Sequence, residues 1–417
     1  MSESIPLIYR LFITLLAFSI FAIIMFFINA PLFDVSMEVI TNISKSWNSS
    51  FTTFMRYFTD IALMTVIGVG ALYVLLKESK IAQMMFFDTL MLSWFVAGFL
   101  KNLINEVRPC WKDEKLLVEK PEIDYGNPSG HSLFALCSGL SCLLIYGMEN
   151  KDFYLTEFEA NLAAKRRTGV MYSPKAKVII VIITLFICTM IVYSRVHIGL
   201  HSINQVLHGG VLAILCTCTI FFSFRKELVA LYEAILTRKK TSNLRRNTVL
   251  CFLLAIFGIL AQIILYIILS GRDVKLSEDI VNRIKKLIET FTSTTPLEAG
   301  LLNGCIGSFT VGIHLGLLFG SYCLKINAVR CSMEISLLKR IIRLLFTFTL
   351  IAVILFFPYF FTPPSPVLGF VWVKIIIPVT LAGFILYGLG DYIAMKIGCL
   401  PELPSEELTM GAVKVEA

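Results

Sequence analysis

Long runs of apolar residues, separated by shorter polar stretches, recur along the whole chain. A helix needs about 20 mainly apolar residues to cross the hydrocarbon core of a bilayer. Ten runs approach this length: Leu11–Ile28, Ile61–Leu76, Met84–Leu100, Ser132–Met148, Val178–Tyr193, Val206–Phe222, Val249–Leu269, Leu301–Leu324, Ile341–Phe361 and Leu368–Leu389. The pattern therefore predicts an all-α, polytopic membrane helical bundle with about ten transmembrane helices.

The composition agrees with this pattern. Of the 417 residues, 57% are hydrophobic and only 16% are charged, and a soluble chain of this length would carry more charge. The net charge of +8 does not indicate nucleic-acid binding, because the basic residues lie in the loops between apolar runs. Most of the 11 cysteines fall inside those runs, where they are expected to be small buried residues and not metal ligands.

The distribution of Lys and Arg predicts the orientation in the membrane. Most basic residues outside the runs lie on the face that holds the N-terminus, which makes that face, and both termini, cytosolic. The first run is longer than the apolar stretch of a signal peptide, and Pro31 follows the small residue Ala30, so we expect the helix to be retained. Acceptor sequons at Asn42 and Asn48 then fall in a lumenal loop. Whether either one is glycosylated is left open.

The first polar cluster ends the third apolar run. Arg108 follows Lys101 by seven positions, which on a helix is two turns, so both cations are expected on one helical face. Pro109 is then expected to end the helix. Two cations at a membrane boundary suit an anion with several oxygens, since Arg offers a planar fork and Lys a point charge. Taken alone, the pair also fits ordinary interfacial side chains that reach toward water.

The second cluster, Gly126–His131, opens the fourth run. Its Gly and Pro residues predict a tight turn, and Ser129 is placed to cap the helix that follows. A capped helix start presents free backbone N–H groups and a positive dipole end, which bind phosphate. His131 then lies close to any anion bound there. A helix cap with an incidental His is the plainer alternative.

The third cluster, Ser194–Gln205, connects the fifth and sixth runs and contains Arg195 and His201. Ionisable residues beside an apolar span are candidates for function. The predicted topology places all three clusters on the same, non-cytoplasmic face. Three unrelated polar clusters would not be expected to share one face by chance. Three cations, the N–H groups of the turn and two histidines that titrate near neutrality are the groups that in-line phosphoryl transfer requires.

These motifs resemble those of the type 2 phosphatidic acid phosphatase superfamily, whose signature is Lys-x6-Arg-Pro, then Pro-Ser-Gly-His, then Ser-Arg-x5-His-x3-Asp. The chain matches all three between Lys101 and His201, except that Gln205 stands in place of the final Asp. The motifs are most similar to the glucose-6-phosphatase family, which shares this Gln, a Trp soon after the Arg-Pro (Trp111 here) and a Gly-x-Pro-Ser-Gly-His turn (Gly126–His131). The chain differs from that family in its additional first span, in a shorter loop between the first two clusters and in lacking a C-terminal dilysine.

The resemblance implies a role for each matching residue. His201 attacks phosphorus and forms a phosphohistidine, while His131 protonates the leaving oxygen and then activates water. Five residues hold the phosphoryl group: Lys101, Arg108, Ser129, Gly130 and Arg195. Gln205, one helical turn after His201, orients its ring. The superfamily uses no metal, and neither a metal nor a cofactor is expected here.

The resemblance also divides the chain into four parts. Residues 1–59 are expected to form an additional first transmembrane helix and a lumenal loop, and residues 60–225 the phosphatase core with the three motifs. The resemblance implies a six-helix phosphatase-type core within the bundle. From the apolar runs, residues 226–400 are expected to add further transmembrane helices, and the acidic residues 401–417 are expected to form a mobile tail. Asp60 and Asp88, in or near spans, are expected to make helix–helix hydrogen bonds.

The main functional hypothesis is an integral membrane phosphatase that hydrolyses glucose 6-phosphate or a similar sugar phosphate at a lumenal site of the endoplasmic reticulum. A lipid phosphate or polyprenyl diphosphate phosphatase is the alternative enzyme. A transporter and an inactive superfamily member are the alternatives without activity. They are disfavoured because paired broken helices are not evident and every required histidine and cation is present. The expected partners are the phosphorylated small molecule or lipid, membrane lipids and, for a sugar phosphate, a separate substrate transporter.

Overall fold

Helices make up the regular structure of the residues that the computed structural model describes, which are 6–46, 49–76, 80–113, 116, 122–147, 174–237, 242–271, 277–287, 295–324, 337–356, 371–396 and 398. The α-helices are α1 (Leu7–Ser46), α2 (Ser49–Leu76), α3 (Lys80–Ile104), α4 (Pro109–Lys112), α5 (Gly130–Gly147), α7 (Pro174–His197), α8 (Ile203–Cys218), α9 (Arg225–Thr237), α10 (Ser242–Ser270), α11 (Glu278–Leu287), α12 (Pro296–Cys305), α13 (Phe309–Leu318), α14 (Leu337–Phe356), α16 (Ile377–Phe384) and α17 (Gly390–Lys396). Short 3-10 or π-helical turns join or extend some of them: η4 (Thr219–Ser223), η5 (Ile306–Ser308), η6 (Phe319–Cys323), η9 (Trp372–Ile376) and η10 (Ile385–Leu389).

Each of the ten apolar runs coincides with helix over its described residues. Seven helical stretches are long and apolar enough to cross a membrane: Ser49–Leu75, Ile81–Lys112, Gly130–Gly147, Pro174–His197, Ile203–Ser223, Pro296–Cys323 and Ile377–Lys396. The other three runs correspond to shorter apolar helices, which are Tyr9–Met25, Ala255–Ser270 and Ile341–Leu355. The predicted all-α polytopic membrane bundle is confirmed.

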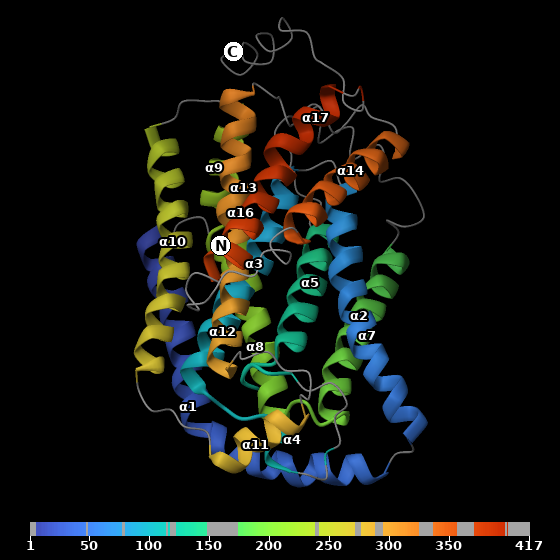
Figure 1. Cartoon of the computed structure of the whole chain (residues 1–417). Helices are drawn as coiled ribbons and strands as arrows, with labels where there is room; N and C mark the ends of the chain where they lie inside the picture. Colours follow the sequence, from blue (N-terminus) through green and yellow to red (C-terminus); the bar gives the residue numbers. More distant parts are fainter. Residues whose placement is uncertain are drawn as a thin grey trace, which may run out of the picture.

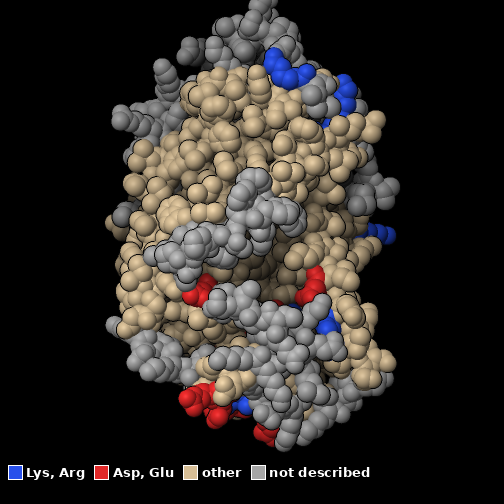
Figure 2. All heavy atoms as spheres, in the orientation of Figure 1, with Lys and Arg blue, Asp and Glu red and all other residues tan. Residues whose placement is uncertain are grey.

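The outward faces of these helices are strongly apolar. Phe27 in α1, Ile61 in α2 and Phe257 in α10 are 74%, 64% and 69% exposed. Burying a side chain of this size contributes about 1.5–3 kcal/mol, so these faces favour a lipid surrounding. In the face shown in Figure 2, uncharged residues cover most of the described surface, and the Asp and Glu side chains visible there lie in its lower half.

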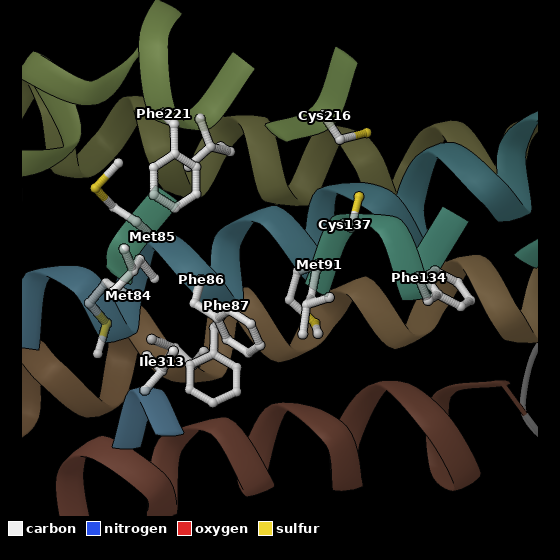
Figure 3. Close-up of a cluster of buried hydrophobic side chains, with 14 of the residues drawn as sticks. Met84, Met85, Phe86, Phe87, Met91, Phe134, Cys137, Cys216, Phe221 and Ile313 are labelled. Atoms are coloured by element: carbon white, nitrogen blue, oxygen red, sulfur yellow. The ribbon is translucent and has the colours of Figure 1, made fainter. Parts of the chain in front are cut away.

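The helix α3 lies at the centre of the bundle. Every residue from Ile81 to Met91 is buried, and α3 packs against α5, α8, α10 and α12. Figure 3 shows the core around it, in which α3 contributes Met84, Met85, Phe86, Phe87 and Met91, and other elements contribute Phe134, Cys137, Cys216, Phe221 and Ile313. The core therefore joins the C-terminal helices to those that carry the motifs.

Glycines allow α3 and α12 to approach closely. A Cβ atom on Gly98 would lie 2.3 Å from the Cα atom of Gly304 and 2.8 Å from the carbonyl oxygen of Gly300. Small residues of this kind let the backbones of membrane helices come together. The approach brings α12 to the end of α3, where Asn303 reaches the site described below.

The N-terminal helix continues far beyond its apolar run. α1 extends to Ser46, and Pro31 lies inside it. A proline inside a helix bends it, and the C-terminal part of α1 lies across one end of the bundle, beside α4 and α11 (Figure 1). The segment with the first sequon, expected to be a loop, is therefore helical, and Asn42 is exposed in it. The second sequon, Asn48, lies outside the described residues.

The same end of the bundle gathers the three motif segments. α3 and α7 end there, and α5 and α8 begin there (Figure 1). An apolar cluster packs beside them, with Ile40 of α1, Met55 of α2, Trp111 of α4 and Ile284 of α11 all buried. The fold thus supplies a packed support for polar residues from separate parts of the chain.

Candidate active site

Lys101 and Arg108 do not lie on one helix. α3 ends before Asn105, which takes a left-handed conformation with a φ of 54°. Arg108 is extended, and Pro109 begins the short helix α4. The prediction of a continuous helix that Pro109 ends was therefore wrong, because the residue before a proline favours extended backbone and proline suits the first turn of a helix. The two cations still converge, since both bind Asp124.

The turn before α5 is tied to both of the other motif segments. The Gly126 N–H donates to the carbonyl of Glu106 (2.8 Å), and the Ser129 N–H donates to the carbonyl of Gln205 (3.0 Å). The N–H of Ser132 in the first turn of α5 lies 3.5 Å from Ser129 Oγ, as expected for a residue that caps the helix. These bonds hold the start of α5 against the other segments.

A tight connection between α7 and α8 holds Arg195 and His201. The His201 N–H donates to the Arg195 carbonyl (3.2 Å), and Gly199 has a φ of 73°, which a residue with a Cβ atom rarely adopts. The N–H of Ser202, which precedes α8, donates to Gln205 Oε1 (3.2 Å). Both Arg195 and His201 are buried.

The carboxylate of Glu122 occupies the point where the three segments meet. It pairs with Arg108 (2.6 Å) and with Arg195. Its oxygens lie 3.6 Å from Nδ1 of His131 and 3.9 Å from Nε2 of His201. Burial alone would raise the pKa of Glu122, but the charges of Arg108 and Arg195 lower it well below its ordinary value. An anion therefore sits beside two cations and both histidines.

A second carboxylate, Asp124, balances the rest of the positive charge. Its Oδ2 accepts from Lys101 (2.5 Å) and from Asn303 of α12 (2.8 Å), and its Oδ1 accepts from Arg108 (2.6 Å). The backbone carbonyl of Asp124 also accepts from Arg108 Nε (2.8 Å). Asp124 is thus fixed through main chain and side chain and is 8% exposed, whereas Glu122 is 31% exposed and is the more easily displaced anion.

One nitrogen of His201, Nε2, faces the Glu122 carboxylate. Its Nδ1 lies 3.1 Å from Gln205 Oε1, and the Gln205 amide nitrogen donates to the Val107 carbonyl (3.0 Å). That arrangement makes Oε1 the acceptor, so Nδ1 carries the proton and Nε2 keeps its lone pair. Arg108 Nη1 lies 2.9 Å from Nε2. Burial, together with the charges of Arg108 and Arg195, lowers the pKa of His201 well below its ordinary value, so the ring is neutral.

His131 lies in the first turn of α5 and has an acidic neighbour on each side. Its Nδ1 faces Glu122, and its Nε2 lies 3.3 Å from Oδ1 of Asp60 on α2. The same Asp60 oxygen is 3.8 Å from Arg195 Nη1. The structure therefore brings a carboxylate from α2 into contact with two of the predicted site residues.

Three further buried polar residues, Asp88, His314 and His208, make their contacts away from Glu122 and Asp124. Asp88 accepts a hydrogen bond from Tyr232 of α9, whose hydroxyl also lies 3.2 Å from His314 Nε2. His208 Nδ1 lies 3.1 Å from Asn127 Oδ1. These contacts join helices or support the turn before α5. Asp88 thus makes the helix–helix hydrogen bond that the sequence suggested.

The predicted site residues lie close together. A Cβ atom on Gly130 would lie 4.0 Å from Lys101 Nζ, which places the start of α5 against the cation group. The Ser129 hydroxyl accepts from Ser132 Oγ (3.2 Å) within its own helical turn, so its contact with phosphate stays a prediction. Within the described residues, no group of three or more His, Cys, Asp or Glu side chains is arranged to hold a metal ion.

The sequence did not single out Glu122, Asp124, Asn303 or the site contact of Asp60. One signal was available, since buried cations require counter-ions and two acidic residues stand just before the Gly126 turn. No motif or spacing in the sequence indicates that Asn303 and Asp60 reach the site. Their contacts depend on how α12 and α2 pack against the motif segments.

The fold and site together define an all-α membrane protein in which buried cations pair with two carboxylates beside two histidines. Residues 83–229 match the PAP2 superfamily, so the chain carries a PAP2 superfamily domain, as the motifs predicted. The chain is 26% identical over 176 residues to Dolichyldiphosphatase 1 of Dictyostelium discoideum. This match covers 42% of the chain and 66% of the relative, so the chain spans just under two thirds of that relative's length. No solved structure matches the chain.

Proposed function

We propose that this protein is an integral membrane phosphatase that acts on a phosphorylated lipid of the polyprenyl diphosphate class through a phosphohistidine intermediate. The PAP2 superfamily domain supports the reaction class, and the dolichyldiphosphatase relative favours a polyprenyl diphosphate over a sugar phosphate. One observation carries the proposal: the Glu122 carboxylate, paired with Arg108 and Arg195, lies 3.6 Å from His131 and 3.9 Å from His201. A phosphoryl group is an anion that can use the same donors.

The proposed reaction has two balanced steps. In the first, Nε2 of His201 bonds to phosphorus as the bond from phosphorus to the leaving oxygen breaks. The leaving oxygen takes a proton from Nδ1 of His131. In the second, a water oxygen bonds to phosphorus, the P–N bond breaks, and the water proton goes to Nδ1 of His131. Arg108 and Arg195 stabilise the charge on the phosphoryl oxygens throughout.

The shape of the molecule supports a substrate that stays in the bilayer. The face shown in Figure 2 is hollowed, and Asp and Glu side chains border the hollow on a surface that is otherwise mostly uncharged. A lipid can approach such an opening laterally, with its chain in hydrocarbon and its phosphate toward the polar groups. A sugar phosphate has no apolar part to place there.

A sugar phosphate, glucose 6-phosphate or a similar one, is the second candidate. It is favoured by Gln205, Trp111 and the Gly126–His131 turn, which resemble the glucose-6-phosphatase family. For either substrate we propose the membrane of the endoplasmic reticulum, with the site lumenal and both termini cytosolic. The concentration of basic loop residues on the opposite face supports this orientation.

A substrate panel on the purified full-length protein tests the proposal. We expect a polyprenyl diphosphate to be hydrolysed with a kcat/KM at least about tenfold above those of phosphatidic acid and glucose 6-phosphate. The activity should persist in EDTA, because cationic side chains stabilise the charge. His201→Ala should abolish turnover and trapping of the labelled phosphoenzyme.

The controls separate substrate from chemistry. If glucose 6-phosphate is the best substrate, the lipid proposal fails but the phosphatase proposal stands. If His201→Ala keeps near-normal activity, or if EDTA abolishes activity and magnesium restores it, the proposed chemistry is wrong.

A further inference from the structure

An acidic side chain from an apolar helix reaches into the candidate site. Asp60 lies in α2, which is long and apolar enough to cross a membrane. Its Oδ1 stands 3.3 Å from Nε2 of His131 and 3.8 Å from Nη1 of Arg195. Ionisable residues within such helices are costly and usually functional, and Asp60 belongs to none of the three motifs.

The two nitrogens of the His131 ring face different partners. Nε2 faces Asp60, and Nδ1 faces the Glu122 carboxylate at 3.6 Å. An ionised carboxylate can only accept, so Asp60 favours a proton on Nε2 in both charge states of the ring. Nδ1 is then the nitrogen that gives and takes a proton at the reaction centre.

We propose that Asp60 is a positioning residue for His131, which turns Nδ1 toward the phosphoryl group and stabilises the imidazolium that acts as the acid. This inference rests on the proposed phosphatase function. Asp60 is the suitable partner because it remains when substrate displaces Glu122. The second carboxylate near His131 would then be gone, and the phosphoryl group itself gives up negative charge as its bond to the leaving oxygen breaks.

The surrounding charges show why such a partner is needed. In the described part of the chain, three charged groups face the His131 ring: Asp60 from α2, Glu122 from the segment before α5, and Arg195 from α7. Arg108 and His201 lie on the other side of Glu122. The cations disfavour a second positive charge on His131. Asp60 offsets them, as a carboxylate beside a catalytic histidine does in acyl-transfer sites.

The exposure of the pair also fits this role. The Asp60 side chain is 61% exposed, whereas that of His131 is 17% exposed. Asp60 therefore lies at the edge of the site, while His131 lies further inside it. Through one catalytic cycle, the Nδ1 proton leaves to the departing oxygen and returns from water, so the ring ends in its starting charge state.

The test compares Asp60→Asn and Asp60→Glu with the wild-type full-length protein. Loss of a general acid typically costs about 10²–10⁴ in rate, so we expect Asp60→Asn to lower kcat by about 10- to 100-fold for an alkyl phosphate, with little change in KM. An aryl phosphate, whose leaving group needs no proton, should lose less than about threefold. Asp60→Glu should recover part of the activity, and the alkaline limb of the Asp60→Asn pH profile should move to lower pH.

Asp34→Asn is the matched control, since Asp34 is 70% exposed and pairs with Lys112 at the same end of the bundle (2.9 Å). It should behave as the wild type.

Modification of His131 by diethylpyrocarbonate, followed by mass spectrometry across pH, gives a readout without turnover. The midpoint of this modification should move to lower pH in Asp60→Asn. Equal losses for alkyl and aryl phosphates, or an unchanged modification midpoint, would overturn the role of Asp60. Absence of phosphatase activity in the wild type would overturn the proposed function, and the modification midpoint would still report on the pair.

Discussion

His201 and His131 differ in their neighbours, although both lie beside the same anion. The nitrogens of His201 face the neutral amide of Gln205 and the guanidinium of Arg108. His131, in contrast, has the Asp60 carboxylate at 3.3 Å. Environments that separate two titratable groups in this way assign them different roles in catalysis. The neutral ring suits the nucleophile, and the ring beside a carboxylate suits the acid.

The pH dependence of activity follows from the burial of His201. Its pKa in the folded protein is lowered well below the ordinary value of 6.5, so His201, the proposed nucleophile, stays neutral as the pH falls. A histidine with an ordinary pKa would be about 90% protonated at pH 5.5 and would lose about tenfold in activity. We expect less than a twofold loss in kcat/KM between pH 7 and pH 5.5 for an aryl phosphate, after correction for ionisation of the substrate. A tenfold loss would contradict the assignment.

The Glu122 carboxylate should compete with the substrate for its donors. The charges of Arg108 and Arg195 keep it ionised through the neutral range, so any phosphoryl group must displace it. We expect Glu122→Gln to lower the inhibition constant of inorganic phosphate by about tenfold, which corresponds to about 1.4 kcal/mol. Asp34→Asn, which removes a charge away from Glu122 and Asp124, should leave this constant unchanged. Weaker phosphate binding in Glu122→Gln would show that Glu122 organises the donors and does not compete for them.

At the scale of elements, the sequence predicted the helices better than the conformation of the segments that connect them. The apolar runs identified the spans because the bilayer sets their length. The helix was expected to continue to Arg108, but it ends before Asn105, since the conformations of Asn105 and of the residue before Pro109 depend on local backbone preferences. Asp60 and Asn303 lie on α2 and α12. The periodicity of the sequence does not predict which helices these two pack against, so only the packed structure reveals the site contacts of Asp60 and Asn303.

The close approach of α3 and α12 gives a test of that packing. A Cβ atom on Gly98 would meet the backbone of Gly304 at 2.3 Å, and a backbone cannot move aside as a flexible side chain can. Overpacking of this kind typically costs about 1–3 kcal/mol. We expect Gly98→Ala to lower the Tm in detergent by several degrees and to raise KM, because α12 also carries Asn303 to Asp124. Gly68→Ala in α2, where no atom lies within 4 Å of the new Cβ, should leave both unchanged. Equal Tm values for the two variants would contradict a tight α3–α12 contact.

At the scale of the whole molecule, the candidate site draws on more than its PAP2 superfamily domain. Asp60 precedes residues 83–229, and Asn303 follows them, yet both contact charged residues of the site. The helices on either side of the domain therefore do more than cover it. They supply side chains that contact His131 and Asp124.

The orientation of the whole molecule is open to a direct test in sealed microsomal vesicles. The excess of basic residues predicts that the segments 149–177 and 225–248 are cytosolic and that the segment 113–124, beside the site, is lumenal. Residues 149–173, with the tryptic sites at Lys165–Arg167, lie outside the described residues. Trypsin added outside should cut there and near Arg245–Arg246 but spare 113–124, which becomes accessible when detergent opens the vesicles. Cleavage within 113–124 in sealed vesicles would overturn the orientation.

The same vesicles distinguish the two candidate substrates through latency. A charged sugar phosphate cannot cross hydrocarbon unaided, because moving a charge into the bilayer centre costs at least about 3 kcal/mol, so a lumenal site would depend on a separate transporter. Vesicles without such a transporter should hydrolyse glucose 6-phosphate only after detergent treatment. A polyprenyl diphosphate already in the membrane reaches the site by lateral movement within its leaflet. We therefore expect lipid substrate incorporated into both leaflets to be hydrolysed in sealed vesicles at no less than about half of the rate seen in detergent. Full latency toward that lipid, with trypsin protection of 113–124 intact, would exclude lateral entry and favour the sugar phosphate.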